Sequence, residues 1–160
     1  MRDRFVKHSA KDIAGKVWAA PMTACGVVAG ALLSGASLIT GKGARIAIEN
    51  NAITFTTGLN LHGSITFGNA IIHAGGDLRR WNSKSILLRY NRAAYVNLGK
   101  HEEAHTYQYQ TYGIFMIALL LGSAIAHGGF EASSFRDFMA KSDFENVADD
   151  YAQFGRSPIP

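Results

Sequence analysis

The run from Val17 to Thr40 places the strongest constraint on the fold, because it contains no charged residue and is rich in alanine, glycine and serine. A run of this length can cross a bilayer as a single helix. Gly26 and Gly30, which form a G-x-x-x-G pattern, would let a second helix approach closely. Basic residues precede the run, which fits a cytoplasmic N-terminus if the run spans a membrane. The chain must therefore bury this segment or place it in lipid.

Two other interpretations of the run remain open. It can form a buried hairpin of two helices built from small residues, with the turn at Gly30 or Gly35. It can also be a secretory signal, but the stretch before it is long for a charged leader region and no clean cleavage site follows. We therefore expect no convincing cleavable signal peptide.

The rest of the chain predicts an α+β domain. Apolar residues make up 48% of the 160 residues and charged residues only 18%, against about 25% in an average soluble domain. Apolar positions over 4–18 recur three and four apart and predict an amphipathic helix. Alternating apolar residues over 44–73 predict a small antiparallel sheet. Further helices follow, and one of them, over 114–126, is too short to span a bilayer and is expected to be a buried core helix.

We expect three parts in one compact unit. Residues 1–43 are a helical and apolar N-terminal segment, residues 44–155 form the main domain, and residues 156–160 are a loose tail. The pattern over 83–98 is compatible with either a strand or a short helix. The single cysteine, Cys25, excludes an intrachain disulfide and a thiolate-rich metal site. A net charge of +4 with no recognised nucleic-acid motif argues against nucleic acid as a partner.

The pentapeptide His101-Glu102-Glu103-Ala104-His105 carries the chemistry. Histidines at i and i+4 lie on one face of a helix, so both imidazoles can bind one metal ion. Glu102 can then act as a general base toward a water molecule at that ion. Glu103 is expected to face solvent. The helix should run from about Leu98 to Tyr112 and stop at Gly113.

A tetrahedral zinc ion needs a third protein ligand beside two imidazoles and a water molecule. Glu145 is the preferred candidate, and Asp149, one turn later, can accept the free imidazole N–H of a ligand histidine. His127 and Glu131 are the alternative third ligands. The opposing interpretation is an acidic, solvated helix and a pair of surface histidines without any metal.

The segments HEEAH and Glu145-Asn146-Val147-Ala148-Asp149 resemble the two motifs of gluzincin metallopeptidases, HExxH and a downstream ExxAD helix. The pattern over about 45–151 is also similar to small metallohydrolase domains of bacterial polymorphic toxins and secreted effectors. The resemblance implies zinc as cofactor. It also implies a bacterial origin, as a secreted effector or a membrane-associated protein, and a neutralising immunity protein as a partner.

These observations predict a zinc-dependent hydrolase that cleaves an amide bond, in a peptide or in a peptidoglycan-like substrate. His101, His105 and Glu145 would hold zinc, and Glu102 would move the proton. Tyr151, Tyr112 or His127 could donate to the oxyanion. The alternative is a membrane-active toxin or interaction protein that uses residues 17–40, in which the metal site is vestigial or structural.

Overall fold

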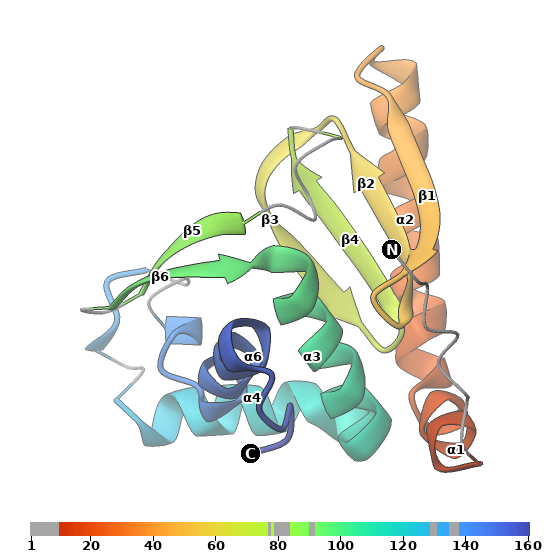
Figure 1. The fold of residues 1–160 in the computed structure, drawn as a ribbon. Helices are drawn as coiled ribbons and strands as arrows, with labels where there is room; N and C mark the ends of the chain where they lie inside the picture. The colour runs from red at the N-terminus through yellow and green to blue at the C-terminus, as the bar shows by residue number, and fades with distance from the viewer. Residues whose placement is uncertain (1–9, 77, 79–83, 90–91, 129–130, 135–137) are drawn as a thin grey trace.

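The computed structural model describes residues 10–76, 78, 84–89, 92–128, 131–134 and 138–160, and Figure 1 shows its fold. It confirms the predicted α+β class. The elements are α1 (Ala10–Trp18), α2 (Ala20–Ile39), β1 (Ala44–Glu49), β2 (Ala52–Thr57), β3 (Asn60–Phe67), β4 (Ala70–Gly75), β5 (Lys84–Arg89), β6 (Arg92–Asn97), α3 (Leu98–Tyr112), the 3-10 turn η1 (Gly113–Phe115), α4 (Met116–Ala126) and α6 (Asp143–Phe154). The first part of the helix predicted over 4–18 lies outside the described residues, and α1 is the remainder.

The main sheet has the strand order β1-β2-β4-β3. A tight turn through Asn50 and Asn51, both with positive φ, joins β1 to β2, and β3 pairs with β4 as a second antiparallel hairpin. However, β2 and β4 pair in parallel, so the prediction of a purely antiparallel sheet is wrong for this pair. The physical reason is burial: Ala70, Ile71 and Ile72 of β4 are buried on both faces, which favours a central position for this strand.

Helix α2 covers one face of this sheet as one continuous helix (Figure 1), so the predicted hairpin with a turn at Gly30 or Gly35 is wrong. Gly26 and Gly30 lie against the sheet. A Cβ atom at Gly26 would lie 2.7 Å from Cβ of Ala70, and one at Gly30 would overlap the ring of Phe55. Small residues thus allow the helix backbone to approach the sheet closely. Only one face of α2 is buried in this way.

The second half of the chain forms the β5–β6 hairpin and a group of helices in which α6 lies against α3 (Figure 1). The pattern over 83–98 is compatible with a strand or a short helix, and the structure shows that most of this range forms the β5–β6 hairpin. A core of Ala19, Tyr109, Met116 and Phe144 joins the α1–α2 junction to α3, α4 and α6.

The segment 114–126 is mostly helical as expected, but the expectation that this helix is buried in the core is wrong. Helix α4 packs against α3 and α6 on one side only, and Met116 and Ala124 are its buried residues. By length and composition alone, two helical stretches of the described chain are apolar enough to cross a membrane, Ala20–Ile39 and Leu98–Ala126.

Candidate metal centre

Helix α3 presents the two histidines of the HEEAH motif. The side chain of Asn97 caps its first turn by accepting a hydrogen bond from the Lys100 amide (3.0 Å), and the helix ends at Gly113, which has a positive φ of 58°. Both predicted boundaries are therefore found. His101 and His105 are buried, and their Nε2 atoms lie 3.2 Å apart.

Helix α6 brings Glu145 to this pair. Ser142 caps α6 by accepting from the Phe144 amide, so Glu145 sits in its first turn. Oε2 of Glu145 lies 3.3 Å from Nε2 of His101, and Oε1 lies 3.3 Å from Nε2 of His105. Each carboxylate oxygen thus faces one imidazole, and the possible ligand atoms, one from each residue, lie within 4.8 Å of one another. The three side chains therefore form a group that could hold a metal ion.

Two further side chains orient the imidazoles. Asp149 accepts from Nδ1 of His101 at 2.7 Å, as its spacing from Glu145 predicted. Gln108 Oε1 lies 2.8 Å from Nδ1 of His105, while Gln108 Nε2 donates to the carbonyl oxygens of Phe144 (3.0 Å) and Pro158 (2.9 Å). These two donations fix the Gln108 amide so that its oxygen faces His105. In the neutral imidazoles these partners would place the proton on each Nδ1 and leave each Nε2 free for a metal ion.

The charges of this cluster are strongly coupled. Burial lowers the pKa of His101, but the hydrogen bond to Asp149 and the contact with Glu145 outweigh it and raise the pKa to about 10. Burial also opposes protonation of His105, yet the charge of Glu145 raises its pKa. Burial would raise the pKa of Glu145, but the two histidines hold it well below the usual value. The site is therefore built to attract positive charge, whether protons or a metal ion.

Glu102 lies beside the group. It is buried, and its Oε2 accepts a hydrogen bond of 2.6 Å from the hydroxyl of Thr66 on β3. Its negative charge also contributes to the raised pKa of both His101 and His105. The predicted base is thus held against β3 by Thr66.

Glu103 does not face solvent, and this prediction is wrong. It is buried, and its carboxylate accepts hydrogen bonds from Lys100 Nζ (2.5 Å), Tyr151 Oη (3.2 Å) and Tyr107 Oη (3.4 Å). The reason is that α6 packs along α3 and closes this side of the helix. Burial and then the charge of Glu103 raise the pKa of Tyr151 above its usual value.

The candidate oxyanion donors contact residues outside the group of possible ligands. The hydroxyl of Tyr151 is bonded to Glu103, and the ring of Tyr112 packs edge-on against Phe144 with centroids 5.5 Å apart. His127 is exposed at the end of α4, where Nδ1 lies 2.9 Å from the carbonyl oxygen of Ser123 and Nε2 lies 3.8 Å from Asp143. The exposed Glu131 and His127 are not members of the group of ligand atoms, which contains Glu145.

Sequence reasoning assigned no role in the site to Gln108 or Thr66. Gln108 lies three residues after His105, and this i, i+3 spacing could have indicated an amide on the same helix face. No comparable signal marked Thr66, because its position depends on how β3 meets α3. Comparison of the chain with protein-family models, curated proteins and solved structures gives no match. The gluzincin resemblance therefore stays a prediction.

Proposed function

We propose that this chain is a zinc-dependent hydrolase of amide bonds, with His101, His105 and Glu145 as the metal ligands. The observation that supports this most is the meeting of two buried imidazole nitrogens, 3.2 Å apart, with a carboxylate whose two oxygens each lie 3.3 Å from one of them. Two imidazoles and a carboxylate are also the ligand set of known catalytic zinc sites, which keep one position open.

Bound zinc would supply a Lewis acid that polarises a carbonyl group and activates a water molecule. Glu102 would accept the proton of the attacking water and deliver it to the leaving amine. The hydroxyl of Thr66 holds one carboxylate oxygen of Glu102 in place. Asp149 and Gln108 would keep both imidazoles in the tautomer that leaves Nε2 free for the metal.

A peptide is the substrate that we propose first. In the four-stranded sheet β3 is one of the two edge strands, and the hydroxyl of its Thr66 donates a hydrogen bond to Glu102. An extended peptide that paired with β3 would therefore pass close to the general base. A peptidoglycan-like substrate, a role as a bacterial effector and a neutralising partner protein rest on the sequence resemblance alone and stay predictions.

Metal content tests the ligand set directly. Mass spectrometry of the purified chain should give about one zinc ion per chain. Glu145→Ala should lose most of this zinc, whereas His127→Ala, which removes an exposed imidazole outside the group, should keep it. Equal zinc content in wild type and Glu145→Ala would rule out Glu145 as a ligand.

Turnover tests the base. Glu102→Gln should keep zinc and lose roughly 10²–10⁴-fold in kcat on an amide substrate, because the base is removed while the ligands remain. A peptide library digested by the wild-type chain, with chelated protein as the control, provides that substrate. Full activity of Glu102→Gln would remove Glu102 from the mechanism.

A further inference from the structure

The face of α1 and α2 that points away from the sheet is an apolar ridge. Because α1 ends at Trp18, α2 begins at Ala20 and Ala19 has helical φ and ψ, the two helices run on almost without a break. Exposed residues at helical spacing line this face, and we define the ridge by them: Val17, Pro21, Cys25, Val28, Leu32 and Ile39. Val17 is 69% exposed, Leu32 71% and Ile39 89%. This amount of exposed aliphatic surface along one line is unusual for a surface helix.

The polar side chains of α2 are turned away from the ridge. Thr23 bonds the carbonyl oxygen of Ala19 and the amide of Asn69, and Ser37 bonds the carbonyl oxygen of Gly43 and the amide of Gly58. Ser34 is buried. Protein interfaces contain about one hydrogen bond per 100–200 Å². A face that offers no hydroxyl, amide or charge suits lipid better than a protein partner.

The apolar surface extends at the start of the ridge. Trp18 lies against Gly113, where a Cβ atom would come within 2.5 Å of its indole Nε1. The neighbouring Ile114 and Phe115 of η1 are exposed. Figure 1 shows this corner, where α1 and α2 meet the end of α3. Tryptophan is enriched where hydrocarbon meets lipid headgroups, because its ring is amphipathic.

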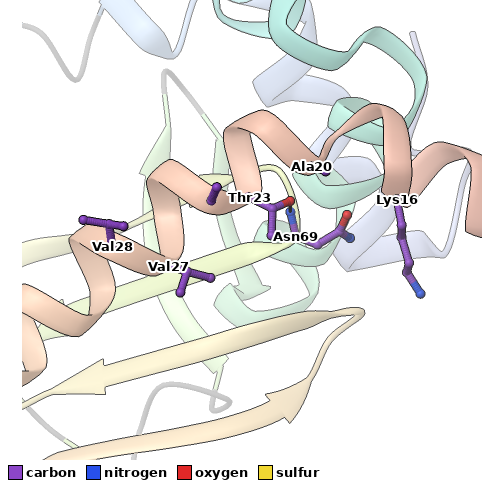
Figure 2. A pocket seen from close by; sticks show the side chains of 7 residues that line it. Lys16, Ala20, Thr23, Val27, Val28 and Asn69 are labelled. Carbon is purple, nitrogen blue, oxygen red and sulfur yellow. Dashed lines mark hydrogen bonds between the residues drawn. The ribbon is translucent and has the colours of Figure 1, made fainter.

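A groove of about 490 Å³ runs beside the ridge (Figure 2). Its walls are mainly aliphatic, with polar groups at one end; the lining residues are Lys16, Ala20, Thr23, Ala24, Val27, Val28 and Asn69. Figure 2 shows Lys16 at the α1 end of the groove and Val28 at the other. The aliphatic walls of this groove suit an acyl chain.

The charges around the ridge favour an anionic surface. Over residues 10–49 the sequence contains two acidic residues, and both are paired, Asp12 with Lys16 (3.0 Å) and Glu49 with Arg45 (3.5 Å). Lys11 and Lys42 lie exposed, one at each end of the ridge. Basic residues near an anionic membrane strengthen binding, and salt screens this attraction.

From this ridge we propose that α1 and α2 dock onto an anionic lipid bilayer, with α2 lying in the plane of the interface. Spanning would require α2 to leave the sheet. Gly26 and Gly30 fit closely against Ala70 and Phe55, and removing the helix would expose that core to water. The proposal does not depend on the metal centre.

Vesicle binding tests the proposal with the full chain. We expect the chain to sediment with phosphatidylcholine vesicles that contain phosphatidylglycerol, more weakly at high salt, and equally well with and without a chelator. Leu32→Glu should bind about tenfold more weakly or worse, because a carboxylate must enter the lipid interface. The control Phe154→Glu, at an exposed apolar position on α6, should bind as the wild type does.

The outcomes separate the alternatives. Equal vesicle binding by wild type and Leu32→Glu would overturn the proposal, provided that circular dichroism shows both folded. Self-association without vesicle binding, abolished by Leu32→Glu, would also overturn it and assign the ridge to a second copy of the chain. Loss of binding only after chelation would transfer the interaction to the metal centre and contradict the proposal.

The natural cysteine provides a second readout. Cys25 is free, exposed and part of the ridge. Anionic vesicles should slow its reaction with a water-soluble maleimide, and phosphatidylcholine vesicles should do so less. If Cys25 reacts equally fast in free and vesicle-bound protein, the ridge is not the surface that contacts lipid.

Discussion

Gln108 holds His105, and two backbone carbonyls hold Gln108 in turn. The Gln108 side chain is fully buried, so solvent does not reach the three hydrogen bonds of its amide group. Such partners of ligand histidines set the ring orientation and the basicity of the metal-binding nitrogen. At the residue scale, the candidate site is therefore larger than the three ligands.

We expect Gln108→Ala to weaken zinc binding by about 10–100-fold, because His105 loses the acceptor that fixes its tautomer. Competition with a chromogenic chelator measures the affinity. Gln153→Ala, which removes the same amide from an exposed position on α6, serves as the control. An unchanged zinc affinity in Gln108→Ala would show that the amide is only a packing element.

Residue spacing alone predicted part of this site. The i, i+4 pairs His101–His105 and Glu145–Asp149 follow from helix geometry, which local sequence determines. The burial of Glu103 could not be predicted in this way, because it depends on Tyr151 from a distant helix. The same limit applies to Tyr151, one of the three candidate oxyanion donors, because its bond to Glu103 depends on the packing of α6 against α3.

At the scale of elements, α2 depends on its glycines in two different ways. A Cβ atom at Gly30 would overlap the ring of Phe55, whereas one at Gly35 would meet no atom within 4 Å. The same substitution should therefore have opposite effects at the two positions of one helix.

We expect Gly30→Ala to lower the free energy of unfolding by about 1–3 kcal/mol, because the added methyl group forces the helix from the sheet. Gly35→Ala should raise it by about 0.5–1 kcal/mol, because alanine loses less conformational entropy in a helix. Urea unfolding of both variants measures the difference. If both variants were stabilised, α2 would not pack on the sheet through Gly30.

Element boundaries were predicted best where the signal is local. Helix α3 ends at Gly113 because this glycine adopts a positive φ, which interrupts the helical backbone. The strand order was not predictable from alternation, because β4 was placed between β2 and β3 by burial on both faces. Whether 83–98 forms a strand or a helix depends on the pairing of β5 with β6, and the residue pattern of one segment carries no information about its pairing partner.

At the scale of the whole molecule, protons and a metal ion would compete for one cluster, that of His101, His105 and Glu145. The pKa of His101 is raised to about 10 from 6.5, so its contribution to stability is fully present below pH 6.5 and is lost as the pH rises toward 10. The pKa of Glu145 is lowered from 4.5, so its contribution is present above pH 4.5 and is lost as the pH falls. Without metal, both contributions are complete between pH 4.5 and 6.5.

The melting temperature of the chelated protein should therefore fall as the pH rises from the acid side of neutrality into the alkaline range. With zinc the trend should reverse, because the ion requires neutral imidazoles and its binding releases protons. Thermal unfolding across this pH range, with chelator and with zinc, measures both trends. His127→Ala should follow the wild-type profiles. Parallel profiles with and without zinc would contradict a shared site.

The sequence by itself determined the α+β class, the helix that carries HEEAH and the spacing of the candidate ligands, because each depends on local periodicity and on residues near one another in the chain. Only the tertiary structure decided that α2 is one helix with a buried and an exposed face, that Glu103 is buried and that Gln108 orients His105. These features arise where segments distant in sequence pack together, and the free energy of that packing is not encoded in any single segment.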